Sequence, residues 1–138
     1  MANQFIPYGR QHITQTDIDA VVNVLQSDFL TQGSQVPAFE ERVAAYTGAK
    51  FGVAVNSATS ALHIACLALG LGQGEKGKDD WLWTTPITFT ASANCGLYCG
   101  ANIDFVDIDP LTLNMSVEAL EAKLKVAKAE NRLPKIVI

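Results

Sequence analysis

Apolar residues in the first 50 positions recur with the spacing of amphipathic helices. Across residues 15–27 they stand at i, i+3, i+4 and i+7, and Thr14 or Thr16 is available as the N-terminal cap. A second apolar stripe follows Pro37, a residue favoured at the start of a helix, and Gly48 provides the stop. The residues before these stripes show no period, so we predict an extended arm followed by two helices.

From residue 51 onward, short apolar runs alternate with helical patterns. The runs predict strands at residues 51–55, 81–85, 103–106 and from 136 onward. Helices are predicted at residues 58–69, between Pro86 and Gly100, and from a Ser116 cap to about residue 132, with an exposed, mobile glycine-rich loop at 70–80. Because helices link successive strands, the sheet should be mainly parallel. The pattern predicts a doubly wound, three-layer α/β domain.

Two segments carry further expectations about packing. The predicted helix at residues 58–69 is apolar nearly all round, so we expect it to be buried. The run that begins at Ile136 starts a core strand, and the sequence stops within it. We therefore expect that the domain is incomplete.

Composition narrows the class of protein. Of the 138 residues, 49% are hydrophobic and 17% are charged, which is apolar enough for a core and excludes intrinsic disorder. The net charge is −4 with no basic stripe, so we expect no nucleic-acid partner. No apolar run is long enough to span a membrane, and the start lacks the pattern of a signal peptide. Three cysteines without a C-x-x-C pair fit a reducing compartment, so we expect a soluble, cytoplasmic protein.

The predicted strand-to-helix junction at residues 56–60 is the first candidate site. Small residues, among them Ser57, Ala58 and Thr59, stand where a helix leaves free backbone N–H groups and a positive dipole end. Such a junction binds phosphate well. The alternative is that Ser57 or Thr59 is an ordinary helix cap, since the segment lacks the glycine fingerprint of a P-loop or dinucleotide site.

The second candidate segment is residues 84–94, TTPITFTASAN, at the carboxyl end of the next predicted strand. Open parallel sheets bind their ligands at this end. Phe89 stands between two threonines and could lie over a flat ligand ring. The alternative is that Phe89 packs in the core, as most phenylalanines do.

Three motifs in order carry a family resemblance: NSATSAL at 56–62, TTPITFTASAN at 84–94 and FVDID at 105–109. With residues 6–33, they resemble the DegT/DnrJ/EryC1/StrS sugar aminotransferases, which are fold-type-I enzymes that use pyridoxal phosphate. The strings LTQG, NSATSAL and TTPI most resemble the branch of UDP-4-amino-4,6-dideoxy-N-acetyl-beta-L-altrosamine transaminases, from pseudaminic acid biosynthesis. The resemblance implies the mainly parallel, three-layer large domain of that fold, truncated. Residues 1–36 would form an arm, first helix and substrate loop, and residues 37–138 the first part of the cofactor-binding domain.

The resemblance also implies roles for individual residues. Ala58 and Thr59 would hold the cofactor phosphate, and Phe89 would stack on the pyridine ring. The positions that match substrate contacts of the branch are Tyr8, Asp28, Phe29, Leu30 and Thr31. Asp107 and Asp109 match family positions, but we expect them to form structural turns.

No catalytic residue is expected within the chain. The family's Schiff-base lysine and the carboxylate that contacts the pyridine nitrogen lie beyond the point that corresponds to Ile138, so the chain alone should be inactive. The resemblance implies a homodimeric enzyme that transfers an amino group, with glutamate as the expected donor, to a UDP-linked 4-keto-6-deoxy-hexosamine. Two alternatives remain open: a sugar dehydratase of the same family, with histidine in place of the lysine, or a non-catalytic fragment or nucleotide-binding module.

The remaining groups of polar residues and cysteines indicate structural roles rather than a functional site. His63 with Cys66, and Cys95 with Cys99, have helical spacings that could mimic a zinc site. Because these cysteines lack standard finger spacing and free cysteines are often buried as small hydrophobes, we expect no metal. The lysines and glutamates of the last predicted helix should form a solvated surface. These residues are Lys123, Lys125, Lys128, Glu118 and Glu121.

Overall fold

The computed structural model describes residues 7–77 and 79–138. They form two compact units, the first ending at Ala54 and the second comprising Val55–Ile138. Residues 1–6 of the predicted arm and Lys78 of the predicted loop lie outside the described residues. The functional division predicted at residue 36 stays a prediction.

The first unit contains two helices, as predicted. Helix α1 (Gln15–Leu25) begins after Thr14, whose side chain accepts from Asp17 N–H, while the Asp17 carboxylate accepts from Thr14 N–H at 2.7 Å. This reciprocal pair is a capping box. Helix α2 (Gln35–Thr47) ends at Gly48, which adopts the left-handed conformation that stops a helix (φ 72°).

The strand predicted at residues 51–55 is wrong, because no strand forms there. Phe51 and Val53 are 77% and 74% exposed. The backbone N–H of Ala54 donates to Glu40 Oε1 of α2 at 2.7 Å rather than to another strand. A strand needs a neighbour that supplies the ladder of hydrogen bonds, and no strand occurs in the described part of the first unit.

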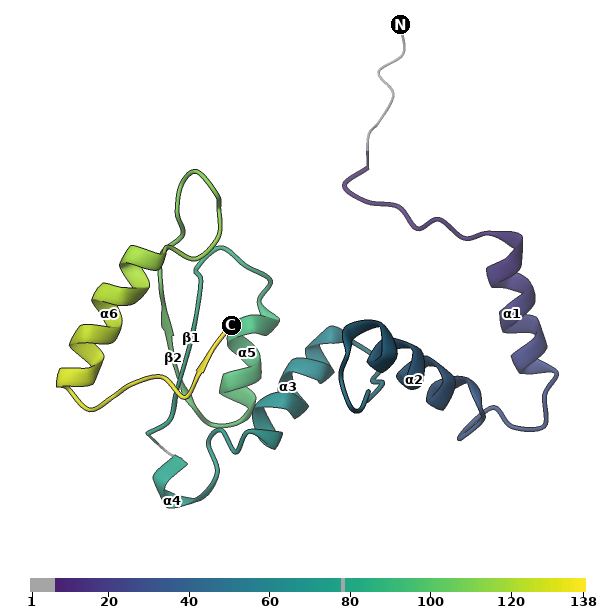
Figure 1. Cartoon of the computed structure of the whole chain (residues 1–138), viewed down its shortest axis with the longest axis horizontal. Coiled ribbons are helices and arrows are strands. Elements are labelled where there is room, and N and C mark those ends of the chain that lie inside the picture. Colours follow the sequence, from purple (N-terminus) through teal and green to yellow (C-terminus); the bar gives the residue numbers. More distant parts are fainter. Residues whose placement is uncertain (1–6, 78) are drawn as a thin grey trace, which may run out of the picture. The chain divides into compact units, whose positions relative to one another are not determined.

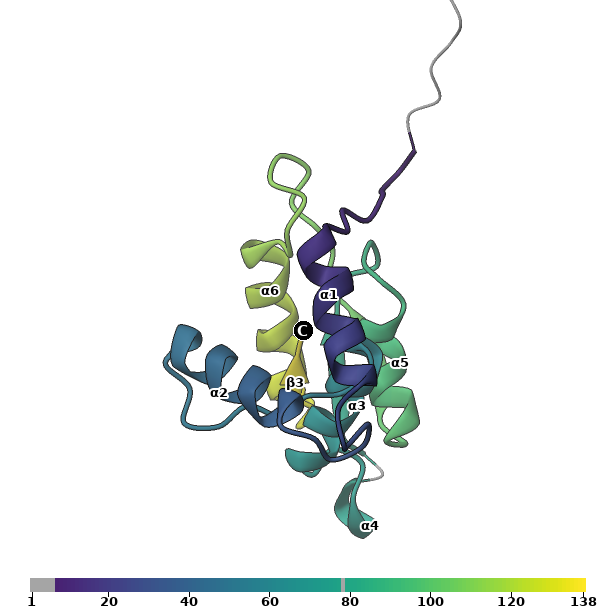
Figure 2. The same ribbon diagram turned by 90° about the vertical axis from the view of Figure 1, so that its right-hand side faces the viewer.

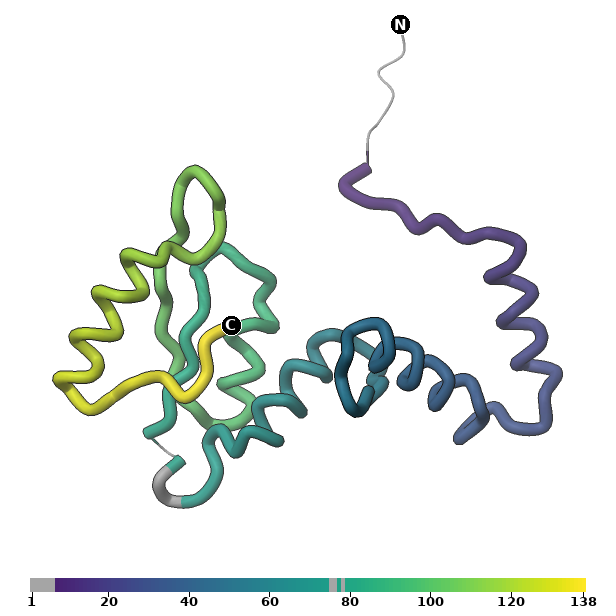
Figure 3. The backbone as a smooth tube through the Cα atoms, viewed as in Figure 1, coloured from purple at the N-terminus to yellow at the C-terminus, as the bar shows by residue number. Residues whose placement is uncertain are grey.

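The second unit is built on a parallel sheet, as predicted. The strands β1 (Trp81–Thr84), β2 (Asn102–Phe105) and β3 (Ile136–Val137) are arranged in the order β2-β1-β3 (Figure 1). Both pairings are parallel, and Trp83 of the central strand lies opposite Asp104 on one side and Val137 on the other. The tube in Figure 3 shows that each return to the sheet runs through a helix.

Helices lie on both faces of this sheet and complete the three layers (Figures 1 and 2). Helix α5 (Ala91–Tyr98) covers one face and packs against α3 (Ala58–Ala68), while α6 (Val117–Ala129) covers the other. Side chains point alternately to the two faces of β1, so this strand contributes residues to the hydrophobic core on each face of the sheet. Leu82 is buried with Cys66 and Cys95 of α3 and α5. Trp83 is buried on the opposite face with Val106 and with Ala127 of α6.

Two packing predictions for this unit need correction. Helix α3 is not buried all round: Cys66 is its one buried residue, and Ile64 and Leu67 are 40% and 39% exposed. Only one side of α3 meets α5, so the opposite apolar side stays uncovered. The glycine-rich loop also contains a short helix, α4 (Gly74–Gly77).

Candidate functional site

The start of α3 is defined by Ser57. This residue has extended backbone angles (φ −160°, ψ 155°), and its Oγ accepts the N–H of Ser60 at 3.1 Å. Its carbonyl accepts the N–H of Ala61 at 3.0 Å, the first bond of the helix. The cap interpretation of Ser57 is therefore confirmed, while that of Thr59 is wrong because Thr59 lies inside the helix.

Several hydrogen-bond donors at this helix start have no partner in the described part of the chain, and three of them come from the predicted phosphate-binding residues. These three are the backbone N–H groups of Ala58 and Thr59 and the hydroxyl of Thr59. The first turn of any helix leaves such N–H groups free, and the helix dipole adds positive potential. Ala58 is exposed and Thr59 half-buried, so an anion can reach both. This donor set fits a phosphate monoester, whose oxygens only accept hydrogen bonds at neutral pH.

Phe89 lies on the segment that leaves the carboxyl end of β1. Its carbonyl accepts the N–H of Ser92 at 2.9 Å and so leads into α5, but its side chain is 72% exposed. The alternative that Phe89 packs in the core is therefore wrong for this structure. An exposed aromatic face on this segment is available to a flat ligand ring.

The structure places the three predicted cofactor residues in the same compact unit. Ala58 and Thr59 begin α3, and Phe89 precedes α5, the helix against which α3 packs. No hydrogen bond or ring contact in the described chain joins Phe89 to either of the other two. The free N–H groups at the start of α3 and the exposed ring of Phe89, just before α5, therefore lie on segments of two helices that pack together.

The predicted substrate residues lie in the first unit. Tyr8 is fully exposed, and Phe29 and Leu30 line a cavity of about 410 Å³ between α1, the loop at 26–34 and the start of α2. Asp28 and Thr31 do not line this cavity. Its remaining lining residues are Ala20, Asn23, Val24, Ser27, Gln32, Gly33, Ser34, Gln35 and Val36.

The chemistry of this cavity follows from its lining. None of the lining side chains carries a charge, and amides and hydroxyls alternate with apolar groups. Such a surface suits a neutral ring with hydroxyl or amide groups. Gln32, which sequence reasoning missed, adopts a left-handed backbone (φ 56°) at the cavity wall, a conformation that is uncommon outside glycine.

The cysteines behave as small hydrophobic residues. Cys66 and Cys95 are buried between α3 and α5, and burial, with the neighbouring Cys95 thiol, raises the pKa of Cys66 to about 12. His63 makes an edge-on ring contact with Tyr98, with the ring centroids 5.3 Å apart. Within residues 7–77 and 79–138, no group of three His, Cys, Asp or Glu side chains is arranged to hold a metal ion.

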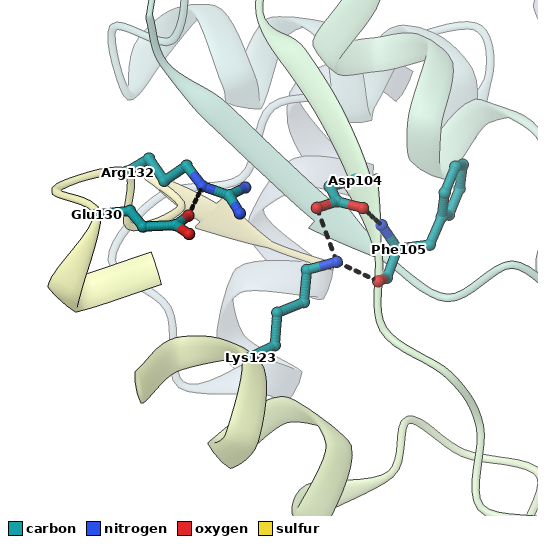
Figure 4. A network of polar contacts seen from close by, with 5 residues as sticks. All are labelled: Asp104, Phe105, Lys123, Glu130 and Arg132. Atoms are coloured by element: carbon teal, nitrogen blue, oxygen red, sulfur yellow. Dashed lines mark hydrogen bonds and ion pairs between the residues drawn. The ribbon is translucent and has the colours of Figure 1, made fainter. Parts of the chain in front are cut away.

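Lys123 departs from the solvated surface predicted for α6. Its ammonium forms an ion pair with Asp104 at 2.7 Å and donates to the Phe105 carbonyl at 2.6 Å, both on β2 (Figure 4). It also lies over the ring of Trp83, 5.1 Å from the centroid. The predicted surface pairing holds for Lys125 and Glu121. Lys123 instead connects α6 to the sheet through its contacts with Asp104, Phe105 and Trp83.

Asp107 and Asp109 form structural turns, as predicted. Asp109 Oδ1 accepts the N–H groups of Leu111 and Thr112 at 2.9 and 2.7 Å, and these bonds lower the pKa of Asp109. The Asp107 carbonyl accepts from Ser116 N–H at 2.9 Å, just before α6 begins. Both aspartates thus shape the connection from β2 to α6.

Comparison with known proteins decides the family. The sequence matches the DegT/DnrJ/EryC1/StrS aminotransferase family over residues 11–130. The chain belongs to this family. It is 44% identical over 119 residues to the UDP-4-amino-4,6-dideoxy-N-acetyl-beta-L-altrosamine transaminase of Campylobacter jejuni, covering 86% of this chain and 30% of that protein. The chain thus spans about 30% of the length of the curated relatives it matches.

Solved structures of sugar enzymes share the fold. Helicobacter pylori PseC, an aminotransferase of pseudaminic acid biosynthesis, aligns with a TM-score of 0.76 and 32% identity over 95% of this chain and 33% of its own. The PLP form of the sugar aminotransferase Spr1654 from Streptococcus pneumoniae also aligns at 0.76, with 33% identity over 85% of this chain and 29% of its own. An E. coli GDP-4-keto-6-deoxy-D-mannose-3-dehydratase with bound hydrated PLP aligns with a TM-score of 0.73 and 26% identity, over 84% of this chain and 30% of its own. The predicted fold is confirmed: this is part of a fold-type-I α/β domain with a parallel sheet.

Proposed function

We propose that the chain forms the cofactor-phosphate and substrate-binding part of a nucleotide-sugar aminotransferase that depends on pyridoxal phosphate. The observation that carries the proposal is the set of three unpartnered donors at the start of α3, from Ala58 and Thr59. Membership in an aminotransferase family supplies the reaction class. A similar structure in a PLP form supports the cofactor.

The residues of the second unit have distinct tasks in this proposal. The N–H groups of Ala58 and Thr59 and the Thr59 hydroxyl bind the phosphate, which fixes one end of the cofactor. Phe89 supports the face of its ring. Pyridoxal phosphate, when bound, supplies an electron-accepting ring for amino-group transfer. By holding both the phosphate and the ring, these residues would orient the cofactor toward its substrate.

The substrate in this proposal is a UDP-linked 4-keto-6-deoxy-hexosamine, with glutamate as amino donor. The names of the Campylobacter relative and of the PseC structure support this class of sugar. Tyr8 and residues 28–31 would contact the nucleotide sugar, and the uncharged cavity beside Phe29 and Leu30 suits a hydroxylated or amide-bearing ring. We further propose a homodimer in the cytoplasm, a location that the three free cysteines support.

The direct test is turnover by the protein in the length that its source cell makes. With pyridoxal phosphate, glutamate and the keto sugar, we expect an amino sugar and 2-oxoglutarate in equal amounts. Thr59→Val should weaken cofactor binding about tenfold, because one hydrogen bond to a charged phosphate is lost. Thr16→Val, at an exposed position of α1, is the matched control and should leave the affinity for the cofactor unchanged. Product formed equally well without the cofactor would refute the proposal.

The same assay distinguishes amino-group transfer from dehydration, the second candidate function. The structural similarity to the E. coli dehydratase is the observation that favours it. Mass spectrometry would then show a sugar that has lost water and gained no nitrogen. Binding of the nucleotide sugar without either product would indicate a non-catalytic binding module.

A further inference from the structure

Strand β2 lies at one edge of the sheet in the described part of the chain, where the strand order is β2-β1-β3. Its inner side is paired with the β1 segment, to which the N–H groups of Asn102 and Val106 donate at 2.9 and 2.8 Å. Successive residues of a strand direct their backbone N–H and C=O groups to opposite edges. The groups of Ile103 and Phe105 therefore point away from β1, toward the place that a further strand would occupy.

Both outward groups of Phe105 are already bonded to side chains of the protein itself (Figure 4). The Phe105 N–H donates to Asp104 Oδ1 at 2.8 Å, and the Phe105 carbonyl accepts from Lys123 Nζ at 2.6 Å. The other carboxylate oxygen of Asp104 forms the 2.7 Å ion pair with Lys123. An incoming strand could bond to Phe105 only by displacing this ion pair.

The sequence of β2 would otherwise favour pairing with another strand. Isoleucine and phenylalanine are typical strand residues, and the side chain of Phe105 is 46% exposed. An exposed edge of this kind is a template for another chain, and charged side chains at the edge, lysine above all, oppose such pairing. The bond from Phe105 N–H to Asp104 joins neighbouring residues of β2, so it contributes nothing to the attachment of α6.

We propose that Asp104 and Lys123 close the outer edge of β2 to strand addition, and that removing them lets two copies of the protein pair through this edge. A second copy is the expected occupant, because each copy offers the same outward groups of Ile103 and Phe105. Two identical edges can pair antiparallel about a two-fold axis. The inference is independent of the proposed function, since neither charged residue is among the predicted cofactor or substrate residues.

A double variant, Asp104→Ala with Lys123→Met, opens the edge by freeing both groups of Phe105, and it leaves the net charge unchanged. The matched control is Glu121→Ala with Lys125→Met, which removes an ion pair of the same charges from the exposed face of α6. Sedimentation velocity over a range of concentrations compares both with the unmodified protein, each in its natural length. We expect the edge variant to self-associate at least about tenfold more tightly than the unmodified protein and the control to match the unmodified protein.

A third substitution in the edge variant distinguishes strand pairing from adhesion of exposed apolar surface. Phe105→Pro removes the outward N–H, which makes no bond to β1, and should restore the association state of the unmodified protein. Phe105→Thr removes the exposed ring but keeps the N–H, so the tighter association should persist.

Two results would overturn the proposal: an edge variant that associates no more tightly than the unmodified protein, or proline and threonine substitutions with the same effect. Far-UV circular dichroism shows whether the edge variant folds. If it does not, Lys123→Met alone frees the Phe105 carbonyl, and Lys125→Met alone is its control. Equal association of these two single variants would then overturn the proposal.

Discussion

Lys135, just before β3, lies with its Nζ 2.9 Å from Asp80 Oδ2, just before β1. The same ammonium donates to the Gly70 carbonyl at 2.7 Å, and Asp80 Oδ2 also accepts the N–H of Gly72 at 2.9 Å. The hydrogen bond from Lys135, followed by that from Gly72, lowers the pKa of Asp80. One carboxylate therefore joins the loop after α3 to two strands of the sheet.

Asp80→Asn should destabilise the protein in a way that depends on pH. Because the pKa of Asp80 is lower in the folded state, its contribution is present above the unfolded value of 3.8 and is lost as pH falls through the folded value. At pH 7 we expect a loss of about 1 kcal/mol, since Lys135 is partly exposed. Urea unfolding at pH 7 and at pH 3 measures it. Asp79→Asn is the matched control, and an equal loss from Asp80→Asn at both pH values would contradict the prediction.

Gly72→Ala should be far more damaging than Gly100→Ala. Both glycines have positive φ, +70° and +79°, so alanine at either position costs about 1 kcal/mol of backbone strain. A Cβ at Gly72 would also overlap the carbonyl oxygen of Cys99, whereas nothing lies within 4 Å of a Cβ at Gly100. We expect Gly72→Ala to cost about 3 kcal/mol or more. Equal melting temperatures for the two variants would show that the contact between Gly72 and Cys99 is absent.

Lys123→Met should cost more stability than Lys125→Met. Lys123 and Asp104 form a partly buried pair, while Lys125 and Glu121 form an exposed pair on one turn of α6. Burial alone would raise the pKa of Asp104, but hydrogen bonds from Lys123 and from Phe105 N–H lower it overall. We expect a loss of about 1 kcal/mol for Lys123→Met and less than about 0.5 kcal/mol for Lys125→Met. Chemical denaturation measures both, and the reverse order would disprove the role of Lys123 in connecting α6 to the sheet.

Cys99 should react with Ellman's reagent faster than the two buried thiols, Cys66 and Cys95, at pH 8. Cys99 is partly exposed and should react first. Cys66 is 2% exposed, and burial raises its pKa to about 12, so it should react only as fast as the protein opens. Cys99→Ser should remove the fast phase and leave the slow phase unchanged. Three equal rates in the folded protein would mean that α3 does not pack on α5.

Local rules predicted most of the fold. Polar side chains before apolar stripes predicted caps at Ser116, at Thr14 or Thr16, and at Ser57 or Thr59, and the structure has Thr14, Ser57 and Ser116 as the caps. The strand predicted at residues 51–55 does not form. A strand needs a neighbouring strand to pair with, and an apolar run in the sequence does not indicate whether one is present. Lys123 was predicted to lie on a solvated surface. Its partner, Asp104, lies on a strand rather than on the same helix, so the spacing of charges along the helix does not indicate this ion pair.

The location of the candidate site stays a prediction, and the details of its geometry could not be predicted from the sequence. Small residues at a strand-to-helix junction indicate an anion site, and the family resemblance added the roles of Ala58, Thr59 and Phe89. The hydrogen bond from the Ser60 hydroxyl to Asn56 Oδ1 depends on side-chain rotamers, so no spacing rule indicates it. The exposure of Phe89 likewise depends on how its segment leaves β1.

The central claim is that the start of α3 binds the cofactor phosphate, and mapping of backbone amide chemical shifts tests it most directly. Titration with pyridoxamine 5′-phosphate should move the amide resonances of Ala58 and Thr59 more than any others in the second unit, and pyridoxamine alone should leave them in place. If the largest shifts fall elsewhere, or if the two ligands shift the same amides equally, the phosphate site proposed at Ala58 and Thr59 is wrong.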